Sequence, residues 1–318
     1  TLLALFREDQ QQPLAESILY HAAGSLLAAK SYDEARRTYL EVTDRFPTGE
    51  LADDALHSAV EAALLAGRLD EAEKLHRRFS EQFTASGLEL PADLLYGRRL
   101  VARGDQLADS GGAEEREQAR QSYRQAAETF LRILKTSQLD RTQTLARLQL
   151  AVAWDRLENY QRVVDALAPL AEGALNADAN DEQLRALFMQ SNAWLALKDD
   201  ERALKTAQQY LERRPDGDHA ADAWANVAVA QAQRGEWEPA LAALEQLGNF
   251  AEGEHELLER ISFEVGEIAY EAQAWATAQS LYQRVVETGT QGEFYLPAVS
   301  GLAYSLYEQG VAGTQASQ

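Results

Sequence analysis

The sequence contains no cysteine, only seven prolines and far fewer basic than acidic residues. Without cysteine the chain has no disulfide, no thiolate metal cluster and no cysteine nucleophile, although it is compatible with a reducing or an oxidising compartment. Its 51 acidic and 30 basic residues give a net charge of −21, which repels the phosphates of nucleic acids and of anionic membranes. We therefore expect no nucleic-acid partner.

Long hydrophobic runs are also missing. No stretch approaches the roughly 20 apolar residues of a membrane-spanning helix, so we expect no membrane insertion by this chain. Residues 1–7 lack the basic region of a signal peptide, and the chain begins with Thr1 rather than Met. We expect a fragment or processed form of a longer protein, from which any targeting segment would have been cut away.

What the sequence does contain is a core-forming composition, with 46% hydrophobic and 25% charged residues, and a repeat. A short sequence motif that ends in alanine recurs along the chain, and its alanines are Ala35, Ala72, Ala203, Ala240 and Ala278. Ala35 and Ala72 are 37 positions apart, as are Ala203 and Ala240, and Ala278 follows 38 positions later. A period of this length indicates stacked structural repeats.

Each motif has the features of a helix N-terminus, because acidic residues interact favourably with the positive end of the helix dipole. The alanine that follows allows another helix to approach closely. A second helical pattern, with apolar residues at i, i+3, i+4 and i+7, lies upstream, as in residues 224–232. Turns at Gly67 and Gly235 separate the two helices, and Pro47 and Pro215 end the second one. The unit is therefore a helix pair that must stack on its neighbours to bury enough apolar surface.

These residues resemble the tetratricopeptide repeat family, whose unit carries large and small residues in its first helix, an alanine early in its second helix and a closing proline. The matching residues are Leu19, Ala22, Ala23, Tyr32, Ala35, Tyr39 and Pro47 in the first unit; Trp224, Val227, Ala228, Trp237 and Ala240 in the sixth; and Val265, Gly266, Trp275, Ala278 and Tyr282 in the seventh. The resemblance implies an all-α fold, a right-handed α-solenoid of stacked antiparallel helix hairpins, with about seven repeats and a terminal helix.

We expect a single solenoid domain over residues 1–318. Its expected units are approximately 16–52, 53–90, 91–143, 144–183, 184–220, 221–258 and 259–293, followed by a terminal helix over 294–310. The third unit departs from the pattern, with a turn at Ser110–Gly112 and a long second helix from about Glu114 to Leu134. The register of this unit therefore stays open.

The repeat period exceeds the usual one of about 34 residues. Such lengthened repeats are similar to those of bacterial envelope proteins, namely the BamD-like lipoproteins and the TolA-binding coordinator proteins. That resemblance implies a periplasmic or envelope-associated location, with a cytoplasmic location as the alternative.

Sequence motifs of metal-binding, phosphate-binding and catalytic sites are missing. The five histidines lack the paired spacing of metal ligands. Residues 176–182 form an acidic run similar to a calcium loop, but without its central glycine and distal glutamate, so we predict an inter-repeat turn there. Phosphate-binding loops and nucleophile elbows are missing as well. We predict no catalytic residue, no cofactor and no metal, in a chain that is not an enzyme.

The tetratricopeptide resemblance places the binding surface on the concave side, which the first helix of each unit lines. The candidate partner-binding residues at these positions are Tyr20, His57, Glu61, Arg185, Phe188, Asn192, Arg260, Phe263, Glu267 and Tyr270. Large apolar and aromatic side chains at such positions can anchor an interface. Two interpretations stay open for Phe188, Phe263 and Tyr270, namely contact with a ligand or packing against the next repeat.

Some chaperone-binding members of the family capture a C-terminal carboxylate with a clamp of basic and amide residues. Asn192, Asn226 and Arg260 match clamp positions, but Phe188 stands in place of a lysine and Glu264 in place of an arginine. Because carboxylate recognition depends on charged donors, we do not expect this chain to act as such a clamp.

The function that follows is a noncatalytic protein–protein interaction scaffold, which binds segments of partner proteins on the concave surface of the first helices. The acidic charge favours a protein partner with a basic component. Two alternatives stay open. The chain could be a structural component of a bacterial envelope or polysaccharide-export assembly, or the docking arm of an enzyme whose catalytic domain lies outside this fragment.

Overall fold

The computed structural model describes residues 14–84, 86, 89–138, 140–176, 179–250, 255–287 and 292–315. Over these residues the chain forms fifteen helices and no strand, and the fold is 83% helical. The predicted all-α architecture of stacked helix hairpins is confirmed. None of the described helices combines the length and the low polarity that a bilayer crossing requires. Of the predicted turn at 176–182, residues 177 and 178 lie outside the described residues.

Contacts divide the chain into two compact units, residues 1–159 (unit 1) and 160–318 (unit 2). The helices of unit 1 are α2 (Ala15–Ala28), α3 (Tyr32–Arg45), α4 (Ala52–Leu65), α5 (Leu69–Gln82), α6 (Glu89–Asp109), α7 (Ala113–Thr136) and α8 (Asp140–Arg156). The boundary between the units falls inside the expected fourth repeat, so the single solenoid over residues 1–318 stays a prediction.

Unit 2 begins with the partner helix expected for α8 and ends with the helix expected at the terminus. Its helices are α9 (Tyr160–Gly173), α10 (Asp181–Ala196), α11 (Asp200–Arg213), α12 (Ala220–Gln233), α13 (Trp237–Gly248), α14 (His255–Glu271), α15 (Trp275–Glu287) and α16 (Tyr295–Gln315).

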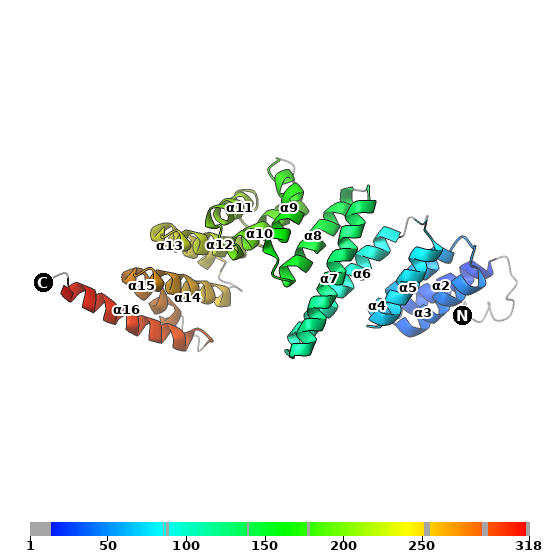
Figure 1. Ribbon diagram of the computed structural model, residues 1–318, viewed down its shortest axis with the longest axis horizontal. Helices are drawn as coiled ribbons and strands as arrows, with labels where there is room; N and C mark the ends of the chain where they lie inside the picture. Colours follow the sequence, from blue (N-terminus) through cyan, green and yellow to red (C-terminus); the bar gives the residue numbers. More distant parts are fainter. Residues whose placement is uncertain are drawn as a thin grey trace. The chain divides into compact units, whose positions relative to one another are not determined.

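Within each unit every helix packs against the next one along the chain, and the first helices of successive pairs also pack side by side. In unit 1 these first helices are α4, α6 and α8, and in unit 2 they are α10, α12, α14 and α16 (Figure 1). Side chains that are far apart in the sequence therefore meet along each row of first helices.

A recurring turn joins the two helices of six described pairs. In the first pair, the Ser31 N–H donates to the Leu26 carbonyl over 2.9 Å, and Lys30 has a φ of 60°. This is the Schellman ending of a helix, in which a residue with positive φ reverses the chain. The positive-φ residues of the six turns are Lys30, Gly67, Glu158, Lys198, Gly235 and Gln273.

The repeat alanines are all buried in the helix packing. Ala35, Ala72, Ala203, Ala240 and Ala278 are each 0% exposed. Because an alanine side chain is only a methyl group, the helix that carries it can approach its neighbour closely, as the repeat pattern predicts. The alanines that repeat in the sequence therefore correspond to buried positions in the helix packing.

In the third pair, different residues allow the two helices to approach each other closely. Its helices α6 and α7 are 21 and 24 residues long. Glycines on α6 face aromatic rings on α7: an added Cβ at Gly97 would lie 2.6 Å from Phe130, and one at Gly104 would lie 2.3 Å from Tyr123. Ring-on-glycine contacts thus bring these longer helices together.

A buried polar cluster joins α5, α6 and α7. The Asp93 carboxylate is buried; its Oδ1 lies 2.5 Å from His76 Nε2 and accepts a 2.8 Å hydrogen bond from Arg132. The His76 ring stacks on Tyr96 with 4.9 Å between centroids. Burial by itself raises the pKa of Asp93, but the hydrogen bonds from His76 and Arg132 outweigh it and lower the pKa. Nothing in the sequence pattern indicated this cluster.

Candidate functional site

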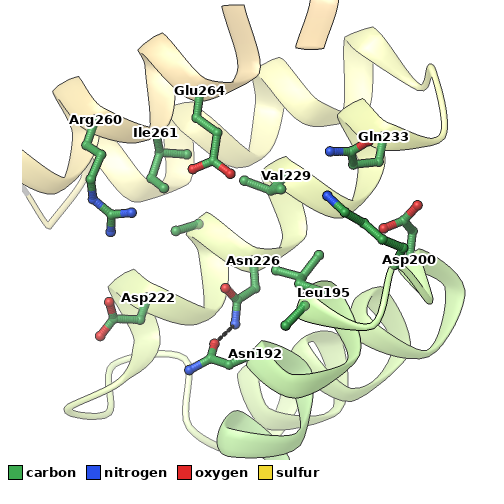
Figure 2. Close-up of a pocket in the computed structure, with 13 residues that line it drawn as sticks. Asn192, Leu195, Asp200, Asp222, Asn226, Val229, Gln233, Arg260, Ile261 and Glu264 are labelled. Atoms are coloured by element: carbon green, nitrogen blue, oxygen red, sulfur yellow. Dashed lines mark hydrogen bonds between the residues drawn. The ribbon is translucent and has the colours of Figure 1, made fainter. Parts of the chain in front are cut away.

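The first helices of unit 2 surround a pocket of about 430 Å³ (Figure 2). Its side chains come from α10, α12 and α14, which belong to three successive helix pairs, and from the first residue of α11 and the turn before it. The lining residues are Asn192, Leu195, Ala196, Lys198, Asp200, Asp222, Ala225, Asn226, Val229, Gln233, Arg260, Ile261 and Glu264. The row of first helices therefore creates one shared space from residues about 34 positions apart.

A pair of side-chain amides crosses from α12 to α10 in this pocket. Asn226 Nδ2 donates to Asn192 Oδ1 and, over 2.7 Å, to Ser191 Oγ (Figure 2). Ser191 Oγ in turn donates to the Phe188 carbonyl over 2.7 Å. Among the described contacts, the Asn192 NH₂ group and the Asn226 carbonyl oxygen keep no partner. One amide donor and one amide acceptor are the groups that hydrogen-bond a peptide backbone.

Charged side chains of both signs stand around this amide pair. Arg260 and Glu264 extend from α14 towards α12, where Asp222 stands (Figure 2). Lys198, in the turn before α11, and Asp200, at the start of α11, stand at the opposite edge. Burial raises the pKa of Asp200, while the positive charge of Lys198 lowers it less strongly. The pocket thus has three acidic and two basic residues. These charges can orient a charged ligand through the dipole and the net charge of that ligand.

A sequence model of the tetratricopeptide repeat matches residues 17–49 and 185–217, which cover the pairs α2–α3 and α10–α11. The chain carries tetratricopeptide repeats. The second matched repeat supplies Asn192 and Leu195 to the pocket, and the two repeats that follow it supply the residues of α12 and α14.

Two solved structures show the same fold. The C-terminal part of a TPR repeat-containing protein from Cytophaga hutchinsonii is 15% identical, with 89% of this chain and 99% of that chain covered and a TM-score of 0.56. The apo form of RapI is 13% identical, with 88% and 78% covered and a TM-score of 0.55. At these identities the likeness shows the fold alone. A search among curated proteins gave no significant match.

Three of the predicted site residues lie on the first helices of repeats in unit 1. Tyr20 on α2 is half-buried, with its ring edge-on to Tyr39 at 5.5 Å. On α4, His57 lies 6.3 Å from the Phe79 ring, and its Nε2 has no hydrogen-bond partner among the described residues. Burial lowers the pKa of His57, and the charge of Glu61 raises it less strongly. These residues do not belong to the pocket of α10, α12 and α14.

Two more predicted residues lie beside the pocket rather than in it. Arg185 is exposed at the rim of a shallow depression that Tyr210 and His219 also line. Phe188 is half-buried and stacks on His219, with ring centroids 4.4 Å apart and planes 7° apart. His219 immediately precedes α12, so Phe188 packs against the next repeat. This contact matches the packing interpretation of Phe188.

The remaining aromatic candidates share a different groove. Phe263, Glu267 and Tyr270 line a groove between α14 and α16, together with Tyr282 and Tyr304. Sequence reasoning missed Tyr282 and Tyr304, because it looked for binding residues only on the first helices of complete pairs. Within unit 2 the predicted residues therefore fall into three places: Asn192 and Arg260 line the amide pocket, Arg185 and Phe188 lie beside it, and Phe263, Glu267 and Tyr270 line the groove between α14 and α16.

The pocket does bring together the three residues that match clamp positions. Asn192, Asn226 and Arg260 line it, but so does the Glu264 carboxylate, one helical turn from Arg260. Phe188 is turned away onto His219. At the clamp positions a carboxylate ligand would meet one guanidinium and one like charge, which agrees with the expectation that the site is not a carboxylate clamp.

Proposed function

We propose that this chain is a noncatalytic scaffold that holds an extended segment of a partner protein along the first helices of unit 2. The observation that carries the proposal is the amide pair of Asn192 and Asn226, which offers a donor and an acceptor across two repeats. An extended segment presents a C=O and an N–H at regular spacing, so its backbone can bind to such a pair without a fixed side-chain sequence. Side chains of the segment would then enter the spaces on either side.

The partner segment has a basic component in this proposal. The pocket lining carries one more acidic than basic residue, within a chain of net charge −21. A basic segment gains from this potential during its approach and at the bound site, whereas an acidic segment is repelled. Arg260 then orients the segment, since it favours a nearby backbone carbonyl or acidic side chain of the partner.

Selection from a random-peptide phage library on the immobilised 318-residue chain tests this function. We expect enriched peptides with basic residues, and we expect Asn226→Ala to weaken their binding about tenfold, because the Asn226 acceptor is lost and Asn192 loses the hydrogen bond that orients its amide. Asn249→Ala is the matched control, since it removes an exposed asparagine from the end of α13 in the same unit. Isothermal titration calorimetry measures the affinities, and far-UV circular dichroism checks the fold.

No enrichment above an unrelated acidic helical protein would contradict the proposal. Equal losses for Asn226→Ala and Asn249→Ala would also contradict it, because the binding surface would then lie elsewhere.

The place of the scaffold in a larger assembly is a separate question. The lengthened repeats support the proposed likeness to BamD-like lipoproteins and TolA-binding coordinators, and with it a role in a cell-envelope assembly. Crosslinking in the native organism followed by mass spectrometry tests this role. Recovery of envelope proteins supports it, whereas recovery of a covalently continuous catalytic domain supports the enzyme docking arm.

A further inference from the structure

The groove between α14 and α16 has a volume of about 380 Å³ and is distinct from the amide-lined pocket. Phe263, Glu267 and Tyr270 stand at i, i+4 and i+7 on α14, so they share one face of that helix. Gly301 and Tyr304 belong to the facing side of α16. Two helix faces therefore oppose each other across the groove, and α15 lies behind both of them.

Tyr282 of α15 forms the floor of the groove. Its side chain is 0% exposed, because the ring lies between Gly266 and Gly301, where an added Cβ would come within 3.1 and 2.6 Å of it. The Tyr282 hydroxyl donates a hydrogen bond to Glu267 Oε1. Burial is the main cause that raises the pKa of Tyr282, and Glu267 and Glu271 add to it. The phenol therefore keeps its proton and holds the Glu267 carboxylate in one orientation.

Aromatic rings surround this carboxylate. Phe263 and Tyr270 are half-buried on one wall, and Tyr304 stands on the other with 62% of its surface exposed. The rings of Phe263 and Tyr270 are fixed by edge or tilted contacts to Phe294 at 5.4 Å and to Trp275 at 5.0 Å. Rings held in this way keep their remaining faces towards the groove without losing side-chain entropy on binding.

Among the described residues that line this groove, Glu267 is the only charged one. Tyr282 is its hydrogen-bond donor, so the described groove supplies no cation to balance the carboxylate. Aromatic faces carry partial negative charge and attract cations, and the attraction grows where water is displaced. A space of this size, with one carboxylate and four aromatic rings, fits a cation on an apolar stem.

We propose that the α14–α16 groove binds an arginine side chain of the partner segment. A guanidinium is planar, so it can stack on Tyr304 or Tyr270 while its N–H groups donate to Glu267, which an ammonium group does less well. This assignment rests on the proposed scaffold function and names the basic residue that the scaffold recognises. The arginine assignment is supported by the residues of the groove, which are separate from the amide pair.

The test measures binding of acetyl-arginine methylamide to the full chain by ligand-observed NMR, with the neutral isostere acetyl-citrulline methylamide as reference. We expect the arginine compound to bind at least about tenfold more tightly, and Glu267→Gln to remove most of that difference. Tyr304→Ala, on an exposed ring, should weaken binding about three- to tenfold. Glu256→Gln is the matched control, because Glu256 is an exposed carboxylate on the same helix that lines neither this groove nor the amide-lined pocket.

Equal binding of the arginine and citrulline compounds would overturn the assignment, and so would an equal effect of Glu256→Gln and Glu267→Gln. Tyr282→Phe gives a second variant, which keeps the ring and removes only the donor to Glu267; we expect a loss of about two- to threefold. The scaffold can fail independently of the groove. Arginine binding without any enriched peptide would refute the scaffold alone, whereas enriched peptides with no preference for arginine over citrulline would refute the groove alone.

Discussion

The buried carboxylate of Asp93 has a predictable effect on stability. Its lowered pKa means that the negative charge stabilises the folded state at pH values above the unfolded pKa of about 4, and that this contribution is lost as the pH falls through the lower folded value. We expect Asp93→Asn to reduce the free energy of unfolding by about 2–3 kcal/mol at pH 7, because Arg132 and His76 lose their partner. The deficit should shrink below about pH 4.

Urea denaturation of both proteins between pH 3 and 7 measures this deficit. Asp70→Asn is the control, because Asp70 is 86% exposed and pairs with Arg103 only at 3.7 Å, so its loss should be near zero. A deficit that does not depend on pH would show that Asp93 acts through its hydrogen-bond acceptors rather than through its charge.

Individual residues also show how far the sequence could predict the candidate sites. Helix periodicity placed Asn192 and Arg260 on first helices, and the row of first helices brings them into one pocket. Tyr282 could not be predicted as the floor of a groove, because it belongs to a second helix. It reaches the groove only because Gly266 and Gly301 leave space for its ring. Such contacts depend on which helices meet, which a single repeat pattern does not specify.

At the scale of helices, the six Schellman turns provide a matched set of positions. Lys30 adopts a φ of 60° and Gly67 a φ of 73° at equivalent places, although only glycine has no steric cost there. We expect Lys30→Gly to raise the free energy of unfolding by about 0.5–1 kcal/mol, since relief of backbone strain exceeds the added entropy of the unfolded chain. Gly67→Ala should lower it by about 1 kcal/mol.

The Gly67 substitution isolates the backbone effect, because an added Cβ there would have no heavy atom within 4 Å. Chemical denaturation monitored by circular dichroism measures both variants. Opposite signs are expected, and two changes of the same sign would contradict the conformational explanation. The sequence revealed only the turns that contain Gly67 and Gly235. Lys30, Glu158, Lys198 and Gln273 carry no such signal, although their backbone follows the same path.

For the whole molecule, two electrostatic effects oppose each other. Ion pairs join successive second helices in unit 1, such as Arg36 with Glu71 at 2.5 Å and Arg78 with Asp44 at 2.7 Å. An exposed pair such as Arg78 with Asp44 contributes about 0.2–1 kcal/mol and weakens in salt, whereas only 11% of the Arg36 side chain is exposed, so salt screens that pair less. The net charge of −21 acts in the other direction, because like charges destabilise the folded chain and salt screens their repulsion.

We expect the repulsion to dominate, because 51 acidic residues cannot all find partners among 30 basic ones. The melting temperature at pH 7 should therefore rise by about 3–6 °C between about 20 and 200 mM NaCl, and then level off once the Debye length falls below the spacing between surface charges. Thermal denaturation by circular dichroism measures this. A linear rise that continues to 1 M would indicate a general salt effect on hydrophobic burial instead. A fall in melting temperature would show that the ion pairs between helices stabilise the fold more than the net charge destabilises it.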